Sequence, residues 1–323
     1  MKKERKAYIA SCEVSELKTY SLGGFDQRVL VEGRRKDAPI VIMLHGGPGS
    51  PIPFNAGSRG LFPAFTDHFI AAYWDQLGCG INDHVIDDTF TISQFVDMTA
   101  DLVGCLRTDF PGNPVYLFGM SWGSILAAFT AAQPGLVDGV LVWGQVIRMP
   151  NFSRAAFDAL EQAVPAKVRP ALAQVRQKPE TERNIKDAMN MSAWLRKYTE
   201  GFQAKTGEKA DIASVILGML QSPDYSLKDL KAVMVNGYRK NTSLIYDIGR
   251  TDVGDALRRV TVPYTILQGD KDLVTATADV AAFVSGAENS SLQLEIIPDN
   301  SHMPGNTGMN AVLEHLLCLT QAK

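Results

Sequence analysis

Residues 115–133 read VYLFGMSWGSILAAFTAAQ, an apolar run that passes through a glycine-flanked serine into a second apolar run. The first run is short and continuous, which favours a buried strand, and the second favours a helix over about 124–133 that ends before Pro134. Gly119 and Gly123 permit a sharp turn at Ser121, because neither carries a bulky side chain. We therefore predict that Ser121 lies on a strand-to-helix turn that exposes its hydroxyl as a nucleophile.

Similar apolar runs recur along the chain, at 40–44, 69–74, 140–143, 264–267 and 292–297. Helical patterns separate several of them; one opens at Thr91, where Gln94 completes a capping box. This alternation predicts an α/β fold with a mostly parallel sheet flanked by helices. Gly23 and Gly24 separate two earlier runs, 17–22 and 27–31, which predicts an antiparallel hairpin before the parallel part.

The middle of the chain has a different character from its two ends. From about 145 to 257 amphipathic helical patterns replace the strand-like runs, and the strand pattern resumes at 262–267. We therefore predict a core formed by residues 1–145 and 258–323, with residues 146–257 inserted as a helical cap.

The charge balance narrows the classes of partner. The 323 residues include 32 Lys plus Arg and 35 Asp plus Glu, a net charge of −3, which offers no electrostatic attraction for nucleic acid or an anionic membrane. We expect a small molecule or a short peptide as the substrate. No run approaches the ~20 apolar residues of a membrane span, and the start MKKERKAYIA is too short for a secretory signal, so we expect a cytoplasmic protein. The four cysteines lie far apart, without the spacing of metal ligands, and we expect no metal.

A second glycine-rich motif, HGGPG at 45–49, follows the apolar run at 40–44. Such a turn exposes backbone N–H groups that can stabilise an oxyanion, and we predict the N–H groups of Gly47 and Trp122 as the two donors. We expect His45 to hold this loop and Asp75 to tie down the turn after the run at 69–74.

Together, HGGPG at 45–49, DQLGCG at 75–80 and GMSWGS at 119–124 resemble the prolyl iminopeptidase family of α/β-hydrolases. The resemblance implies an α/β-hydrolase fold with a helical cap, and removal of N-terminal proline from peptides, although many relatives act on other amides or esters. Two stretches depart from the family pattern: Leu77 stands where many members carry Arg, and VWGQV at 142–146 replaces an Arg-Gly form.

A serine nucleophile needs a histidine base and a carboxylate that orients it, and this fold places them in the order Ser, acid, His. Three of the five histidines precede Ser121 and His315 falls in a predicted terminal helix, which leaves His302 in the loop PDNSHMPG at 298–305. The family pattern places the acid three residues after Gly269, at Asp272, while Asp270 stays open as an alternative. This mechanism requires no cofactor.

The substrate is left open by the sequence. An aminopeptidase must hold a cationic amine with cap carboxylates, and an apolar pocket needs aromatic side chains. The candidates of these two kinds are Asp158, Glu161, Glu200, Asp224 and Asp247, and Trp194, Tyr198 and Tyr238. A peptidase of N-terminal proline or a similar residue is the first hypothesis, a carboxylesterase or lactonase with the same triad the second, and a non-catalytic ligand sensor the third.

Overall fold

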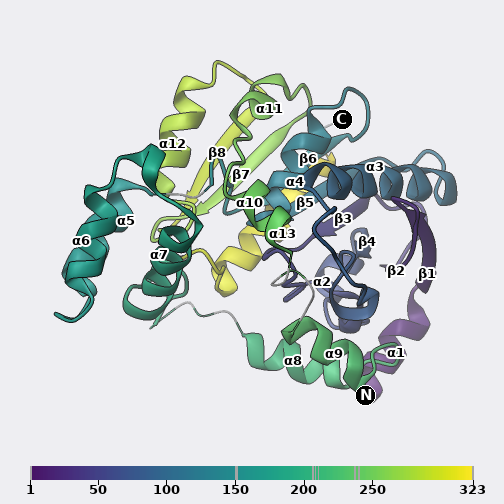
Figure 1. The fold of residues 1–323 in the computed structure, drawn as a ribbon. Helices are drawn as coiled ribbons and strands as arrows, with labels where there is room; N and C mark the ends of the chain where they lie inside the picture. Colours follow the sequence, from purple (N-terminus) through teal and green to yellow (C-terminus); the bar gives the residue numbers. More distant parts are fainter. Residues whose placement is uncertain are drawn as a thin grey trace.

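A single eight-stranded sheet forms the centre of the computed structural model, which describes residues 2–149, 152–205, 207, 209, 211–235, 238 and 241–321 (Figure 1). The spatial order is β1-β2-β4-β3-β5-β6-β7-β8. The strands are β1 (Val14–Leu22), β2 (Phe25–Gly33), β3 (Ile40–Leu44), β4 (Ile70–Tyr73), β5 (Val115–Met120), β6 (Gly139–Trp143), β7 (Tyr264–Gly269) and β8 (Leu292–Ile297). From β4 to β8 all neighbours are parallel, whereas β1 and β2 form an antiparallel hairpin. The predicted sheet and hairpin are confirmed.

Helices cover both faces of the sheet. They are α2 (Pro63–Thr66), α3 (Ile92–Asp109), α4 (Trp122–Ala131), α11 (Gly254–Arg259), α12 (Thr277–Gly286) and α13 (Asn306–Gln321). A further helix, α1 (Lys3–Ser11), precedes the hairpin and contributes no described residue to the sheet cores. Every residue of β3, β5 and β6 is buried, and successive side chains point to opposite faces. The side chains on one face, including Leu117 and Val142, pack against α3, α4, α11 and α12. The side chains on the other face, including Phe118, pack against α2 and α13. The continuous apolar runs of the sequence therefore reflect burial on both faces.

The segment between β6 and β7 contains the helices α5 (Arg154–Ala163), α6 (Arg169–Gln177), α7 (Ile185–Tyr198), α8 (Ile212–Leu220), α9 (Leu227–Met234) and α10 (Thr242–Ile248). Its helices form separate groups in Figure 1, with α5, α6 and α7 apart from α8 and α9. Each group has a small apolar core of its own, and that of α8 and α9 includes Leu61 and Phe62 from the loop after β3.

The two ends of this helical segment pair with each other. Met149 N–H donates to Thr251 O at 2.9 Å, and Val253 N–H donates to Ile147 O at 2.8 Å. After this pairing, α11 packs against α4 of the core. Among the described residues, no helix is both long and apolar enough to cross a membrane.

Candidate active site

Ser121 occupies the turn between β5 and α4 in a strained backbone conformation, with φ 52° and ψ −115°. The single residue makes the whole turn, so α4 begins at Trp122, and the predicted helix start near residue 124 is wrong by two residues. Ser121 N–H donates to Trp143 O on β6 at 3.0 Å. A Cβ at Gly123 would lie 2.0 Å from Leu44 O, so glycine is required where α4 passes β3.

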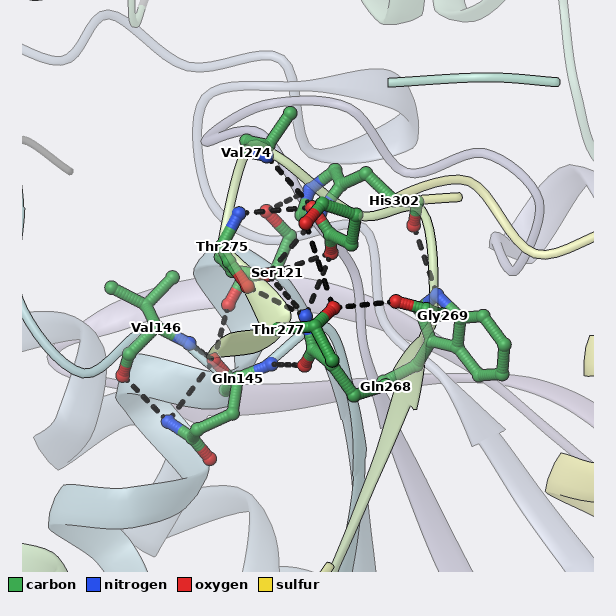
Figure 2. A network of polar contacts seen from close by, with 12 residues as sticks. Ser121, Gln145, Val146, Gln268, Gly269, Val274, Thr275, Thr277 and His302 are labelled. Atoms are coloured by element: carbon green, nitrogen blue, oxygen red, sulfur yellow. Dashed lines mark hydrogen bonds and ion pairs between the residues drawn. The ribbon is translucent and has the colours of Figure 1, made fainter. Parts of the chain in front are cut away.

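His302 lies beside this turn, in the loop between β8 and α13 (Figure 2). Its Nε2 is 2.9 Å from Ser121 Oγ, and its Nδ1 is 2.8 Å from Asp272 Oδ2. Trp143 Nε1–H donates to His302 O at 2.9 Å, which anchors the loop to the sheet. Both the imidazole and the carboxylate are buried, with His302 3% and Asp272 1% exposed.

The Asp272 carboxylate accepts hydrogen bonds at both oxygens. Oδ1 accepts from the N–H groups of Val274 and Thr275, at 2.7 and 3.0 Å. Oδ2 accepts from Thr275 Oγ1 at 2.8 Å and from Gln268 Nε2 at 3.0 Å, in addition to His302 Nδ1. An ionised carboxylate only accepts, so His302 carries its proton on Nδ1 and presents the Nε2 lone pair to the serine.

The alternative acid has a different partner. Asp270 is exposed, and its Oδ1 accepts from the Asn300 N–H at 3.1 Å. The structure thus places Asp272 against His302, whereas Asp270 ties together the loops after β7 and β8.

The loop after β3 lies against the serine turn. A Cβ built on Gly46 would lie 3.5 Å from Ser121 Cβ and 3.3 Å from Met120 O. Gly47 adopts φ 121°, and a side chain there would meet the N–H groups of Gly49 and Ser50 at 2.7 Å. Trp122 provides the first amide of α4, an end where helix amides have no carbonyl partner in the preceding turn. The two predicted N–H donors therefore belong to two segments that adjoin Ser121, the loop after β3 and the first turn of α4.

His45 and Asp75 are buried and hold loops. His45 Nδ1–H donates to Gly46 O at 2.9 Å, and burial lowers the pKa of this imidazole to about 4, so the ring stays neutral. Asp75 accepts from the N–H groups of Ala56 and Ile81, at 3.2 and 2.9 Å, and burial raises the pKa of this carboxyl to about 7. Both contacts agree with the expected holding roles.

The predicted substrate-binding residues have other partners. Asp158 and Glu161 form ion pairs with Arg176 at 2.6 and 2.8 Å, and each carboxylate is about half exposed. Trp194 packs against the apolar core of α5, α6 and α7. Tyr238 is buried, and its hydroxyl donates to Leu77 O at 2.6 Å. None of these contacts involves the serine, histidine or aspartate described above.

Sequence reasoning missed three residues around the histidine and its acid. Gln268 and Thr275 bind Asp272, and a signal existed for both: a glutamine ends an apolar strand, and a threonine follows the aspartate at turn spacing. Phe202 comes from the segment after α7, with its ring centroid 5.9 Å from that of His302, and its carbonyl accepts from Met303 N–H at 2.8 Å. No local pattern in the sequence marks Phe202.

The polar network extends beyond the acid. Gln145 N–H donates to Gln268 Oε1 at 3.2 Å (Figure 2). Tyr264 Oη donates to Gln145 Oε1 at 2.7 Å. Gln145 belongs to the VWGQV stretch that departs from the family pattern. Within the described ranges, no group of three or more His, Cys, Asp or Glu side chains is arranged to hold a metal ion.

A profile of the Alpha/beta hydrolase family matches residues 41–311. The chain belongs to the α/β-hydrolase family. Within it, the probable aminopeptidase YbaC of Bacillus subtilis is 24% identical over 269 residues, which cover 81% of this chain and 82% of that protein. The proline iminopeptidase of Heyndrickxia coagulans is 35% identical over 112 residues, and the match spans 34% of this chain and 36% of that protein.

The structure of the proline iminopeptidase of Mycobacterium smegmatis superimposes with a TM-score of 0.62 at 22% identity. The superposition covers 95% of this chain and 99% of that one, and at this identity it establishes the α/β-hydrolase fold. The family and these relatives support hydrolase activity.

Proposed function

We propose that the protein is a serine hydrolase that cleaves a small amide or ester through an acyl-enzyme intermediate. The supporting observation is the hydrogen-bonded chain from Ser121 Oγ through the two ring nitrogens of His302 to Asp272 Oδ2, with distances of 2.9 and 2.8 Å. Such a chain activates a serine hydroxyl, because the histidine accepts the proton and the carboxylate stabilises the resulting imidazolium.

In the proposed reaction, Ser121 Oγ attacks the carbonyl carbon of the substrate while its proton moves to His302 Nε2. The oxyanion that forms is stabilised by the N–H groups of Gly47 and Trp122 and by the positive end of α4. The imidazolium then protonates the leaving amine or alcohol as the bond to the acyl carbon breaks. A water molecule, deprotonated by the same histidine, releases the acyl group and restores the serine.

The substrate class we propose first is a peptide with N-terminal proline or a similar residue, bound beneath a cap formed by residues 146–257. Relatives named as an aminopeptidase and as proline iminopeptidases support this choice. A carboxylesterase or lactonase is the second candidate, and one observation favours it. Three of the five candidate carboxylates for an ammonium group are already paired, Asp158 and Glu161 with Arg176, and Asp224 with Arg59 at 3.1 Å.

The nucleophile is tested by Ser121→Ala, with Ser93→Ala, an exposed serine on α3, as the matched control. We expect Ser121→Ala to lose nearly all turnover and all labelling by an organophosphonate, while Ser93→Ala keeps both. Full activity in Ser121→Ala would refute the proposed mechanism.

The substrate class is tested with three compounds: proline arylamide, N-acetylproline arylamide and p-nitrophenyl acetate. An aminopeptidase cleaves the free proline arylamide and not the acetylated one, because the acetyl group removes the ammonium charge. Turnover of the ester alone would favour the second candidate. Slow covalent labelling without turnover of any of the three would instead indicate a ligand sensor.

A further inference from the structure

Gln76 lies in the turn 75–80 after β4 and contacts both segments that flank the serine. Its side-chain Oε1 accepts from Trp122 Nε1–H at 2.8 Å, on the residue that follows Ser121. Its backbone N–H donates to His45 Nε2 at 3.1 Å, at the start of the loop that contains Gly47. One residue thus connects the segments that carry the two oxyanion donors of the proposed mechanism.

The donor and acceptor roles in this connection are unambiguous. An indole N–H can only donate, so the Gln76 atom that faces Trp122 is the amide oxygen. His45 Nε2 accepts from the Gln76 N–H, which places the imidazole proton on Nδ1, where Gly46 O accepts it at 2.9 Å. Burial keeps this ring neutral, so His45 Nε2 stays unprotonated and can accept from the Gln76 N–H.

Burial makes the connection rigid. Gln76 is 0%, Trp122 2% and His45 3% exposed, and the Trp122 ring packs edge-on against Phe95. Cys79 Sγ donates to Gln76 O at 3.1 Å, a hydrogen bond within the turn 75–80. Gln76 Nε2 is buried with no hydrogen-bond partner among the described residues, so the side chain is oriented through Oε1.

We propose that Gln76 is a positioning residue that holds the Trp122 N–H and the Gly47 N–H toward one point beside Ser121. This inference rests on the proposed function. Oxyanion stabilisation depends on donors placed in advance at the distance that the transition state requires. Loss of the Gln76 contact therefore weakens the transition state and leaves ground-state binding of the substrate nearly unchanged.

The test compares Gln76→Met, Trp122→Phe and the double variant with wild type. Methionine has nearly the shape of glutamine but no acceptor oxygen, and phenylalanine keeps the main-chain N–H of residue 122 but lacks the indole donor. Each single variant should lower kcat by about 10- to 100-fold, with KM within about twofold, since a displaced donor costs less than a deleted one. The rate of organophosphonate labelling should fall by a similar factor, and the double variant should be little worse than either single one.

Gln27→Met provides a matched control. Gln27 is equally buried, and its Oε1 accepts from the Trp74 indole N–H at 2.9 Å, but on β2 instead of beside Ser121. This variant loses the same type of hydrogen bond, so we expect a lower melting temperature and an unchanged kcat.

An unchanged kcat and labelling rate in Gln76→Met, or an effect on KM alone, would overturn this inference while leaving the proposed function intact. If Gln76→Met does not fold, Trp122→Phe decides by the same two measurements. Turnover that does not depend on Ser121 would overturn the proposed function and this inference together.

Discussion

Replacing Asp272 with asparagine puts an NH₂ group where the structure supplies only donors. At the Oδ2 position, the amide nitrogen would face His302 Nδ1–H, with 2.8 Å between the heavy atoms. The ring can relieve this clash by moving its proton to Nε2, which then points at Ser121 Oγ and can no longer accept a proton. At the Oδ1 position, the NH₂ group would face the N–H groups of Val274 and Thr275 and displace their loop.

The first orientation removes the base from the proposed mechanism, and the second displaces the loop that holds the acid. We expect kcat to fall about 10⁴-fold, which corresponds to about 5.5 kcal/mol of transition-state stabilisation. The wrong tautomer leaves the substrate site intact, so KM should change far less than kcat.

The assay is steady-state turnover of whichever substrate wild type hydrolyses, with organophosphonate labelling and circular dichroism on the same samples. Asp270→Asn is the control, because asparagine at this exposed position can still accept from the Asn300 N–H. We expect that variant to stay within about twofold of wild type. If Asp272→Asn keeps more than a tenth of the wild-type kcat, or if Asp270→Asn loses as much, then Asp272 is not the acid.

Three other substitutions test the loops and the turn. The pKa of buried His45 is about 4, against an ordinary 6.5, so the folded protein binds fewer protons than the unfolded chain between these pH values. As the pH falls from 7 to 4, this group should lower the free energy of unfolding of wild type by about 3 kcal/mol. Urea unfolding at each pH should show no such loss in His45→Gln. The pKa of Asp75 is raised from 3.8 to about 7, so the pH dependence has the opposite sign. As the pH rises from 4 to 7, this group should lower the free energy of unfolding of wild type by about 3 kcal/mol, a loss absent from Asp75→Asn. For either residue, the same pH dependence of unfolding in the variant and in wild type would contradict the prediction. Gly123→Ala, whose Cβ would lie 2.0 Å from Leu44 O, should destabilise the folded protein by about 2–3 kcal/mol and slow organophosphonate labelling. Gly104→Ala, in open space on α3, is the control and should not destabilise the protein. A Gly123→Ala protein with the melting temperature and labelling rate of wild type would show that the turn can relax.

Local patterns in the sequence predicted the strands of the sheet. Continuous apolar runs predicted the buried strands β3 and β5 at their observed bounds, because burial on both faces leaves no polar position in a central strand. The order of motifs along the chain also predicted which serine, aspartate and histidine to compare. The helix start was wrong because Ser121 alone absorbs the turn through its strained backbone, a conformation that no residue pattern specifies.

Contacts between distant segments were decided by the tertiary structure. Asp272 rather than Asp270 faces His302, because the direction in which each side chain leaves the loop after β7 depends on packing against Gln268 and Thr275. Likewise, Arg176 pairs with two carboxylates of α5 that the sequence offered as amine ligands, Asp158 and Glu161, since α5 and α6 pack side by side. The sequence alone specified the chemical groups and the strands that carry them; only the packed chain determined which groups meet, because hydrogen bonds and ion pairs form between side chains that are close in space and remote in sequence.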